Sequence, residues 1–109
     1  MAEPTWIRVA GPGELGENAV ATVTAGDREL CLVHVTGRWA ALDNACPHQG
    51  GPLGEGDLDQ ARDGTWVVRC PWHGWAFVAL TGEAPGVTPE PGLACYPVEV
   101  REDGIYVAI

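Results

Sequence analysis

The sequence predicts an all-β fold, a small antiparallel sandwich or barrel, on three observations. Fifteen glycines and nine prolines among 109 residues are many for this length, and both residue types interrupt helices and separate strands. Short runs of apolar and β-branched residues recur between these breaks. The length is that of one domain, which buries only about two-thirds of the surface of its unfolded chain. A bound metal would therefore add useful stability.

Each strand candidate is a short run bounded by glycine, proline or a polar turn. The candidates lie at residues 6–9, 20–24, 29–35, 39–42, 65–69, 75–80, 96–100 and 105–108. Turns at residues 25–28, at 36–38 and at Asp103-Gly104 join neighbouring candidates into hairpins. Residues 11–18 fit either a turn or a short helix.

Two loops that contain proline and glycine interrupt this strand pattern, at residues 43–54 and 70–74. Each follows a strand candidate, so we expect each to be a rigid loop that holds side chains at a strand end. A third loop, residues 82–92, contains three prolines and could fold over the same end.

The charge of the chain excludes some classes of partner. Fifteen acidic residues against six arginines, with no lysine, give a formal net charge of −9. Nucleic-acid phosphates and anionic membranes would repel this charge, whereas a basic patch on another protein would attract it. No signal-peptide pattern is visible, and no run reaches the roughly 18 apolar residues of a membrane span. We therefore expect a cytoplasmic protein with no nucleic-acid or membrane partner.

Each of the first two loops offers one thiolate and one imidazole. Cys46 and His48 lie in the first loop, and Cys70 and His73 lie in the second. Both donor types suit iron or zinc. Two ligands this close in sequence reach around one ion with difficulty, so we expect each loop to supply one ligand to each of two metals. The two cysteines would then bind one metal and the two histidines its neighbour.

These motifs resemble those of the Rieske family, in the form of its small soluble ferredoxins. The resemblance rests on Cys46-Pro47-His48 with Gly51-Pro52-Leu53, and on Cys70-Pro71-Trp72-His73-Gly74. The 21 residues between the motifs, 49 to 69, are a somewhat long spacer. The resemblance implies one [2Fe-2S] cluster per chain, bound by Cys46, His48, Cys70 and His73. It also implies a single Rieske domain over residues 1–109, with a small cluster-binding subdomain, made of the two ligand loops, at about residues 43–82.

The same resemblance implies an electron carrier that is not itself an enzyme. Small Rieske ferredoxins pass single electrons from a flavoprotein reductase to a terminal oxygenase or other oxidoreductase, aromatic-ring-hydroxylating dioxygenases being the commonest setting. Such oxygenases add a catalytic domain with a mononuclear iron, and 109 residues cannot include one.

Two alternatives stay open at this point. The small subunit of an assimilatory nitrite reductase shares the fold, although many of these subunits have lost cluster ligands and all four are present here. A structural zinc-binding interaction module could use the same four residues. Zinc fingers, however, usually pair cysteine with cysteine and histidine with histidine.

Departures from the family pattern predict a low reduction potential. High-potential Rieske proteins carry a disulfide between the cluster loops, and the matching positions here are Gly51 and Trp72. They also place a serine and a tyrosine where this chain has Trp75 and Phe77, so the hydroxyl donors to the cluster sulfurs are missing. We expect a potential near the low end of the Rieske span of about −150 to +300 mV.

The remaining distinctive residues have simpler interpretations. Cys31 and Cys95 are expected to be buried small hydrophobes, and their further role is not set by the sequence. His34 is expected to be a surface or core residue, and Trp6 and Trp39 are expected in the core.

The acidic run Glu55, Asp57, Asp59 and Asp63 lies between the two ligand loops. Its simpler interpretation is a solvated loop. The alternative hypothesis is a docking patch for a basic reductase or oxygenase, because the run is close to both ligand loops in sequence.

Overall fold

The computed structural model describes residues 5–45, 52–71, 76–82 and 93–109, which form ten strands and one short 3-10 turn. No α-helix occurs in these ranges, and every strand pairing is antiparallel. The all-β prediction is therefore confirmed. Within the same ranges, no helix has the length and apolar character that crossing a membrane requires.

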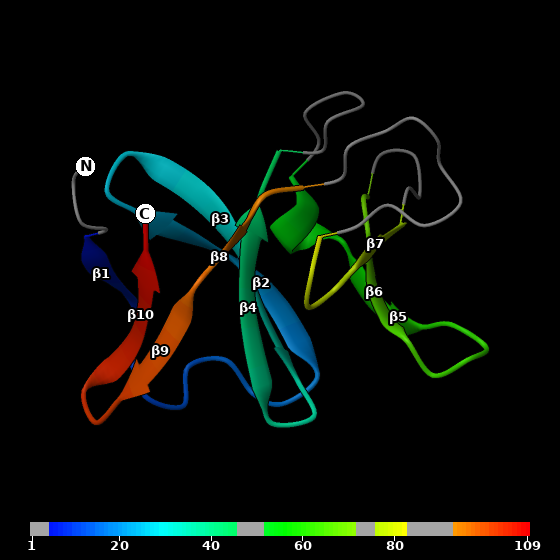
Figure 1. Ribbon diagram of the computed structural model, residues 1–109, viewed down its shortest axis with the longest axis horizontal. Helices are drawn as coiled ribbons and strands as arrows, with labels where there is room; N and C mark the ends of the chain where they lie inside the picture. The colour runs from blue at the N-terminus through cyan, green and yellow to red at the C-terminus, as the bar shows by residue number, and fades with distance from the viewer. Residues whose placement is uncertain (1–4, 46–51, 72–75, 83–92) are drawn as a thin grey trace.

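The described strands form three sheets, which follow one another across the molecule in Figure 1. The first sheet contains β1 (Trp6–Ala10), β10 (Gly104–Ala108) and β9 (Val98–Arg101), in that order. The second contains β2 (Ala19–Ala25), β3 (Arg28–Val35), β4 (Arg38–Asp43) and β8 (Cys95–Tyr96). The third contains β5 (Asp57–Gln60), β6 (Trp66–Arg69) and β7 (Ala76–Val78), and it is preceded by the 3-10 turn η1 (Leu53–Glu55).

Strand β3 is buried on both faces, and its alternate residues enter two different cores. Leu30 and Leu32 belong to an outer core, whereas Cys31 and Val33 belong to an inner core. Successive side chains of a strand point to opposite faces, so one strand can serve both cores. Each fully buried leucine contributes about 1.5 to 3 kcal/mol.

The two cores connect the three sheets. The outer core joins the first two sheets and comprises Ala10, Ala25, Leu30, Leu32, Ala41, Ile105 and Val107. The inner core joins the second sheet to η1 and the third sheet, and comprises Cys31, Val33, Val35, Ala40, Leu42, Leu53, Val68, Cys70, Phe77 and Ala79. The second sheet therefore lies between the other two layers, and the inner core includes Leu53 and Cys70, one residue of each predicted ligand loop.

The hairpins of the second sheet form where the sequence predicts them. Ala25 pairs with Arg28 across a two-residue turn, and Val35 pairs with Arg38 across another. In the second turn Thr36 and Gly37 both have positive φ, 47° and 77°. Two positive φ values in a row are the geometry that a tight hairpin between twisted strands favours.

Two strand predictions need correction. The single strand expected at residues 96–100 is split at Pro97, so that β8 joins the second sheet and β9 joins the first. Proline has no backbone N–H to donate to a ladder, and the break lets the chain change sheets there. Residues 57–60, expected within a solvated loop, form the edge strand β5, because their backbone pairs with β6 while Asp57 and Asp59 stay exposed.

Two burial predictions are wrong. Trp6 is 36% exposed, because β1 is an edge strand and the ring lies on its outer face, 5.8 Å from the Arg101 guanidinium. Cys95 is also exposed, because β8 is a two-residue strand at the edge of the second sheet.

Other burial predictions hold. Cys31 is fully buried, and this burial raises the pKa of its thiol to about 12. Trp39 packs against the outer core, half-buried, and its ring stacks on His34 at 3.9 Å between centroids. His34 is likewise half-buried, and its Nδ1 lies 3.2 Å from the carbonyl oxygens of Leu15 and Gly16.

Candidate metal centre

Of the four predicted ligands, the structure describes Cys70. Cys46, His48 and His73 lie outside the described residues. Cys70 follows β6 directly, is 3% exposed, and carries a free thiol in the inner core. A thiol at the end of a rigid strand, shielded from water, has the donor chemistry and the protection that an iron–sulfur ligand needs.

The second predicted ligand loop closes a hairpin of the third sheet. Strands β6 and β7 pair in register, with Val68 opposite Phe77 and Arg69 opposite Ala76. Residues 70–75 therefore connect two strands that are fixed relative to each other, and this connection carries Cys70 and His73.

The first predicted ligand loop leaves and returns through a hydrogen-bonded base. The Leu53 N–H donates to the Asn44 carbonyl oxygen at 2.7 Å, and Ala45 forms an antiparallel bridge with Pro52. The Asn44 side-chain oxygen accepts a further hydrogen bond from the Gly54 N–H at 2.7 Å. Residues 46–51, which include Cys46 and His48, thus join two segments that hold each other.

The bases of the two loops lie against each other. Gly56, which ends η1, packs so closely on the Arg69 carbonyl that a Cβ atom there would overlap it. Asp57 then pairs with Arg69 in the β5–β6 ladder. The return path of the first loop therefore runs beside the residue that precedes Cys70, and Leu53 shares the inner core with Cys70.

The third predicted loop also has a closed base. The Leu93 N–H donates to the Gly82 carbonyl oxygen at 2.7 Å, and the Asp43 N–H donates to the Ala94 carbonyl oxygen at 3.1 Å. Gly82 has a φ of +80°, and a Cβ atom there would meet the Leu93 carbonyl oxygen at 2.5 Å, so glycine is required. Residues 83–92 of this loop, which could fold over the same end as the ligand loops, lie outside the described residues.

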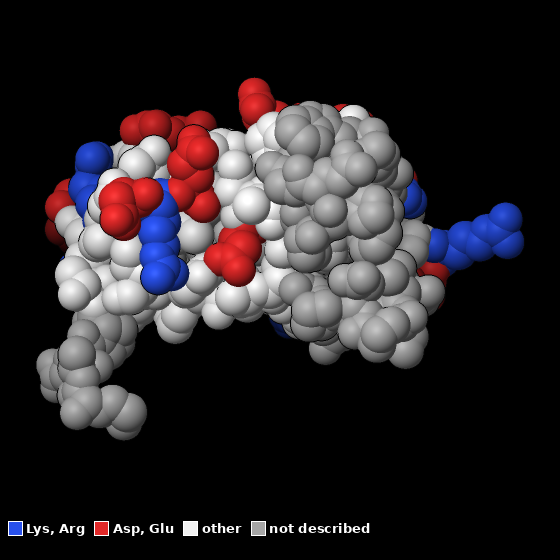
Figure 2. Space-filling model, turned by 90° about the horizontal axis from the view of Figure 1, so that it is seen from above, with Lys and Arg blue, Asp and Glu red and all other residues white. Residues whose placement is uncertain are grey.

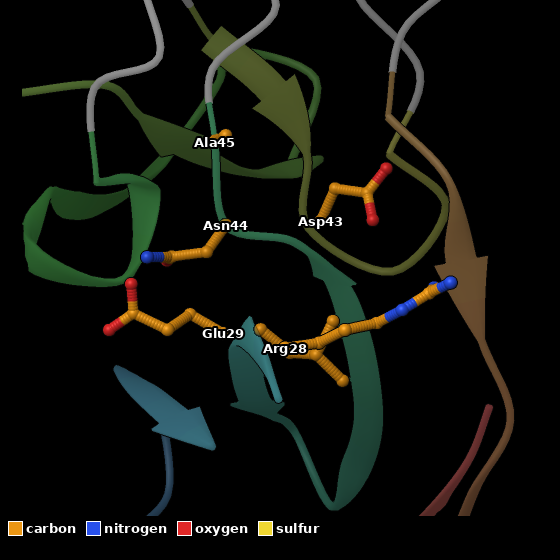
Figure 3. A pocket seen from close by; sticks show the side chains of 6 residues that line it. Arg28, Glu29, Asp43, Asn44 and Ala45 are labelled. Carbon is orange, nitrogen blue, oxygen red and sulfur yellow. The ribbon is translucent and has the colours of Figure 1, made fainter. Parts of the chain in front are cut away.

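A shallow pocket of about 300 Å³ lies at the root of the first loop (Figure 3). Its lining residues are Arg28, Glu29, Leu30, Asp43, Asn44 and Ala45. Beside it the Tyr96 hydroxyl donates to Asp43 Oδ1 at 2.6 Å and accepts from the Arg28 guanidinium at 3.3 Å. The hydrogen bond to Asp43 is the main reason that the pKa of Tyr96 is raised.

Acidic side chains outnumber basic ones among the described residues. On the face seen in Figure 2 the red acidic groups are more frequent than the blue basic ones, in keeping with the net charge of −9. In the acidic run, Asp59 pairs with Arg69 at 3.2 Å, while Asp63 accepts a hydrogen bond from the Thr65 N–H at 3.0 Å. Backbone hydrogen bonds, from Gln60 to Asp59 and from Thr65 to Asp63, are the main reason that the pKa of each carboxyl is lowered. Both residues are exposed.

One residue of this region was missed by sequence reasoning. Asn44 is 6% exposed and is the one buried polar side chain among the described residues. Its position two residues before Cys46 was visible in the sequence. Its partners, Thr22, Leu53 and Gly54, come together only in the fold.

Comparison with known proteins gives the site a family context. Residues 5–97 match the Rieske [2Fe-2S] domain family. The chain is 31% identical to Ferredoxin CarAc of Metapseudomonas resinovorans, over 94% of this chain and 92% of that protein. It is 34% identical over 94 residues to Nitrite reductase [NAD(P)H] of Emericella nidulans, of which it covers 8%.

Some relatives are much longer than this chain. It is 33% identical over 94 residues to the human protein Apoptosis-inducing factor 3, and this match covers 86% of the chain but 15% of that protein. It likewise spans 39% of the human Rieske domain-containing protein.

A solved structure supports the same family. It is described as a complex of reduced oxygenase and oxidized ferredoxin in carbazole 1,9a-dioxygenase, and it matches with a TM-score of 0.79 at 31% identity. The match covers 94% of this chain and 92% of the compared chain. With a family match across most of its length and a relative of similar length, the chain belongs to the Rieske [2Fe-2S] domain family and carries that family's two-iron, two-sulfur cluster.

Proposed function

We propose that Cys46, His48, Cys70 and His73 hold the cluster, with both thiolates on one iron and both imidazoles on the other. Two-histidine, two-cysteine ligation is typical of Rieske centres. The burial of Cys70 at a strand end supports the assignment, as does the contact between the bases of the two loops. In this proposal residues 1–109 form one domain, with the cluster-binding subdomain at about 43–82.

The chain serves electron transfer, and we propose that it carries electrons in the cytoplasm from a flavoprotein reductase to a terminal oxygenase, such as an aromatic-ring-hydroxylating dioxygenase. The cluster supplies reversible one-electron chemistry. The observation that carries the proposal is the match to Ferredoxin CarAc, which extends over nearly the whole of both chains. In this role the chain is a carrier and not an enzyme by itself.

A reconstituted electron-transfer assay tests the proposed role. The purified chain should be required for substrate oxidation when it is mixed with a flavoprotein reductase, its reduced nicotinamide cofactor and a terminal oxygenase of this class. Oxidation that proceeds equally well without the chain would contradict the role. The same mixture without oxygenase serves as the control for direct reduction of oxygen.

A second candidate role is that of a nitrite reductase component. The match to Nitrite reductase [NAD(P)H] favours it, although the chain covers only a small part of that protein. Support of nitrite reduction by the chain, with no support of oxygenase turnover, would select this role over the first.

The acidic run supplies a prediction about docking. Glu55, Asp57 and Asp59 project from η1 and the edge strand β5, and Asp57 lies opposite Arg69, one residue before Cys70. Changing Glu55→Gln, Asp57→Asn, Asp59→Asn and Asp63→Asn together should slow electron transfer to a basic partner by roughly tenfold at low salt. The difference should shrink above about 0.1 M salt, where the screening length is about 10 Å. The rate of electron transfer at each salt concentration is measured by stopped-flow reduction of the partner.

A matched control removes the same charge elsewhere. Its four changes, on the other two sheets and their loops, are Glu17→Gln, Asp27→Asn, Glu99→Gln and Glu102→Gln. These should leave the low-salt rate closer to wild type. Equal rates for the two quadruple variants would show that only net charge matters and that the acidic run is no docking patch.

A further inference from the structure

Asn44 stands out among the described residues because a polar side chain is buried there without a charged partner. It follows β4 directly, is 6% exposed, and lies two residues before Cys46. A buried polar group is costly unless it makes hydrogen bonds, so its partners indicate why it is retained.

The partners of Asn44 lie on the return path of the first ligand loop. Its side-chain oxygen accepts from the Gly54 N–H at 2.7 Å, and its backbone carbonyl accepts from the Leu53 N–H at 2.7 Å. The Thr22 hydroxyl, on β2, donates to the same side-chain oxygen at a longer 3.4 Å. One residue thus ties the outgoing strand of the loop to its returning segment and to a neighbouring strand.

Gly54 has little freedom to find another partner. It is buried, and a Cβ atom there would lie 2.6 Å from the Thr22 backbone nitrogen, so the segment is packed directly on β2. If the Asn44 oxygen were removed, the Gly54 N–H would stay buried without this acceptor. An unpaired buried donor is costly, and the base of the loop would open to relieve it.

We propose that Asn44 is a positioning residue, whose side-chain oxygen closes the base of residues 46–51 and so keeps Cys46 and His48 in place for the cluster. The proposal rests on the ligand assignment above. It adds that the strength of cluster retention depends on a hydrogen bond from a residue that is not a ligand.

The test compares three variants of the cluster-loaded protein. Asn44→Leu keeps the branched shape of the side chain but has no acceptor, whereas Asn44→Asp keeps an oxygen in the same place. Tyr96→Phe is the matched control, because it removes a hydrogen bond from the adjacent Asp43 without touching the returning segment of the loop. The measurements are the rate of bleaching of the visible absorption by an iron chelator and the g values of the reduced protein.

Asn44→Leu should lose its cluster about tenfold faster than wild type, or faster still, and its g values should shift. Asn44→Asp and Tyr96→Phe should stay within about threefold of wild type, because each keeps the acceptor for Gly54. Bleaching of Asn44→Leu at the wild-type rate would overturn the proposal. So would equally fast bleaching of either of the other two variants.

A measurement on the wild-type protein covers the case in which Asn44→Leu does not fold. The Gly54 amide should exchange with deuterium at least about tenfold more slowly than the amides of the exposed turn at Gly26 and Asp27. Equal exchange would overturn the proposal. Failure of the wild-type chain to bind a cluster at all would instead refute the ligand assignment, so the two failures are distinguishable.

Discussion

Replacing Cys70 by alanine should abolish cluster binding. Without its thiolate the cysteine-ligated iron would keep a single protein sulfur, that of Cys46. We expect the purified Cys70→Ala protein to be colourless, with iron and acid-labile sulfide at background level. Absorption spectra and metal analysis of anaerobically prepared protein provide the measurement.

Cys31→Ala is the matched control for this experiment. Cys31 and Cys70 are both buried free thiols of the same inner core. Cys31 lies within strand β3 and in neither predicted ligand loop, and burial raises the pKa of its thiol to about 12. Cys31→Ala should keep its cluster and lose only about 1 kcal/mol of unfolding free energy. A coloured Cys70→Ala protein, or a colourless Cys31→Ala protein, would contradict the assignment.

The second large effect concerns the reduction potential. Phe77 is fully buried in the core that contains Cys70, and its ring carries no hydrogen-bond donor. Phe77→Tyr would add a hydroxyl donor, which stabilises the more negative reduced state. A gain of about 1 kcal/mol for one electron corresponds to about 40 mV, since tenfold is 59 mV. We therefore expect the potential to rise by about 40 mV in a redox titration.

Phe77→Leu separates the hydroxyl from the change in packing. It disturbs the same core site but adds no donor, so it should not raise the potential. An equal rise in both variants would show that packing, and not the missing donor, sets the potential. For the wild-type protein, a potential above roughly +100 mV would contradict the low-potential proposal directly.

The sequence predicted the hairpins of the second sheet correctly because their physics is local. Alternating apolar residues set the strands, and turns such as Thr36-Gly37 set the register. Strand β5 was not recognisable, because Asp57 and Asp59 have low strand propensity and only pairing with β6 orders them. The change of sheets at Pro97 likewise depends on partners far away in the sequence.

The candidate site, like the fold, has features that follow from local sequence and features that depend on contacts between distant segments. The motifs around Cys46 and Cys70 could be read from the sequence, because the spacing of metal-binding side chains is a local pattern. The contact of Gly56 with Arg69 and the role of Asn44 could not, because both arise where separate segments meet. The sequence around a single asparagine next to a strand does not show whether its side chain is buried and hydrogen-bonded to another segment or exposed to solvent in a turn.

The proposed centre is one two-iron cluster held by two thiolates and two imidazoles from separate loops. Its most direct test is an electron paramagnetic resonance spectrum of the dithionite-reduced protein, quantified against its iron and acid-labile sulfide. We expect one unpaired spin per chain with a low average g value, and two irons with two sulfides per chain. A spectrum without signal from protein that holds a single zinc ion and no sulfide would contradict it.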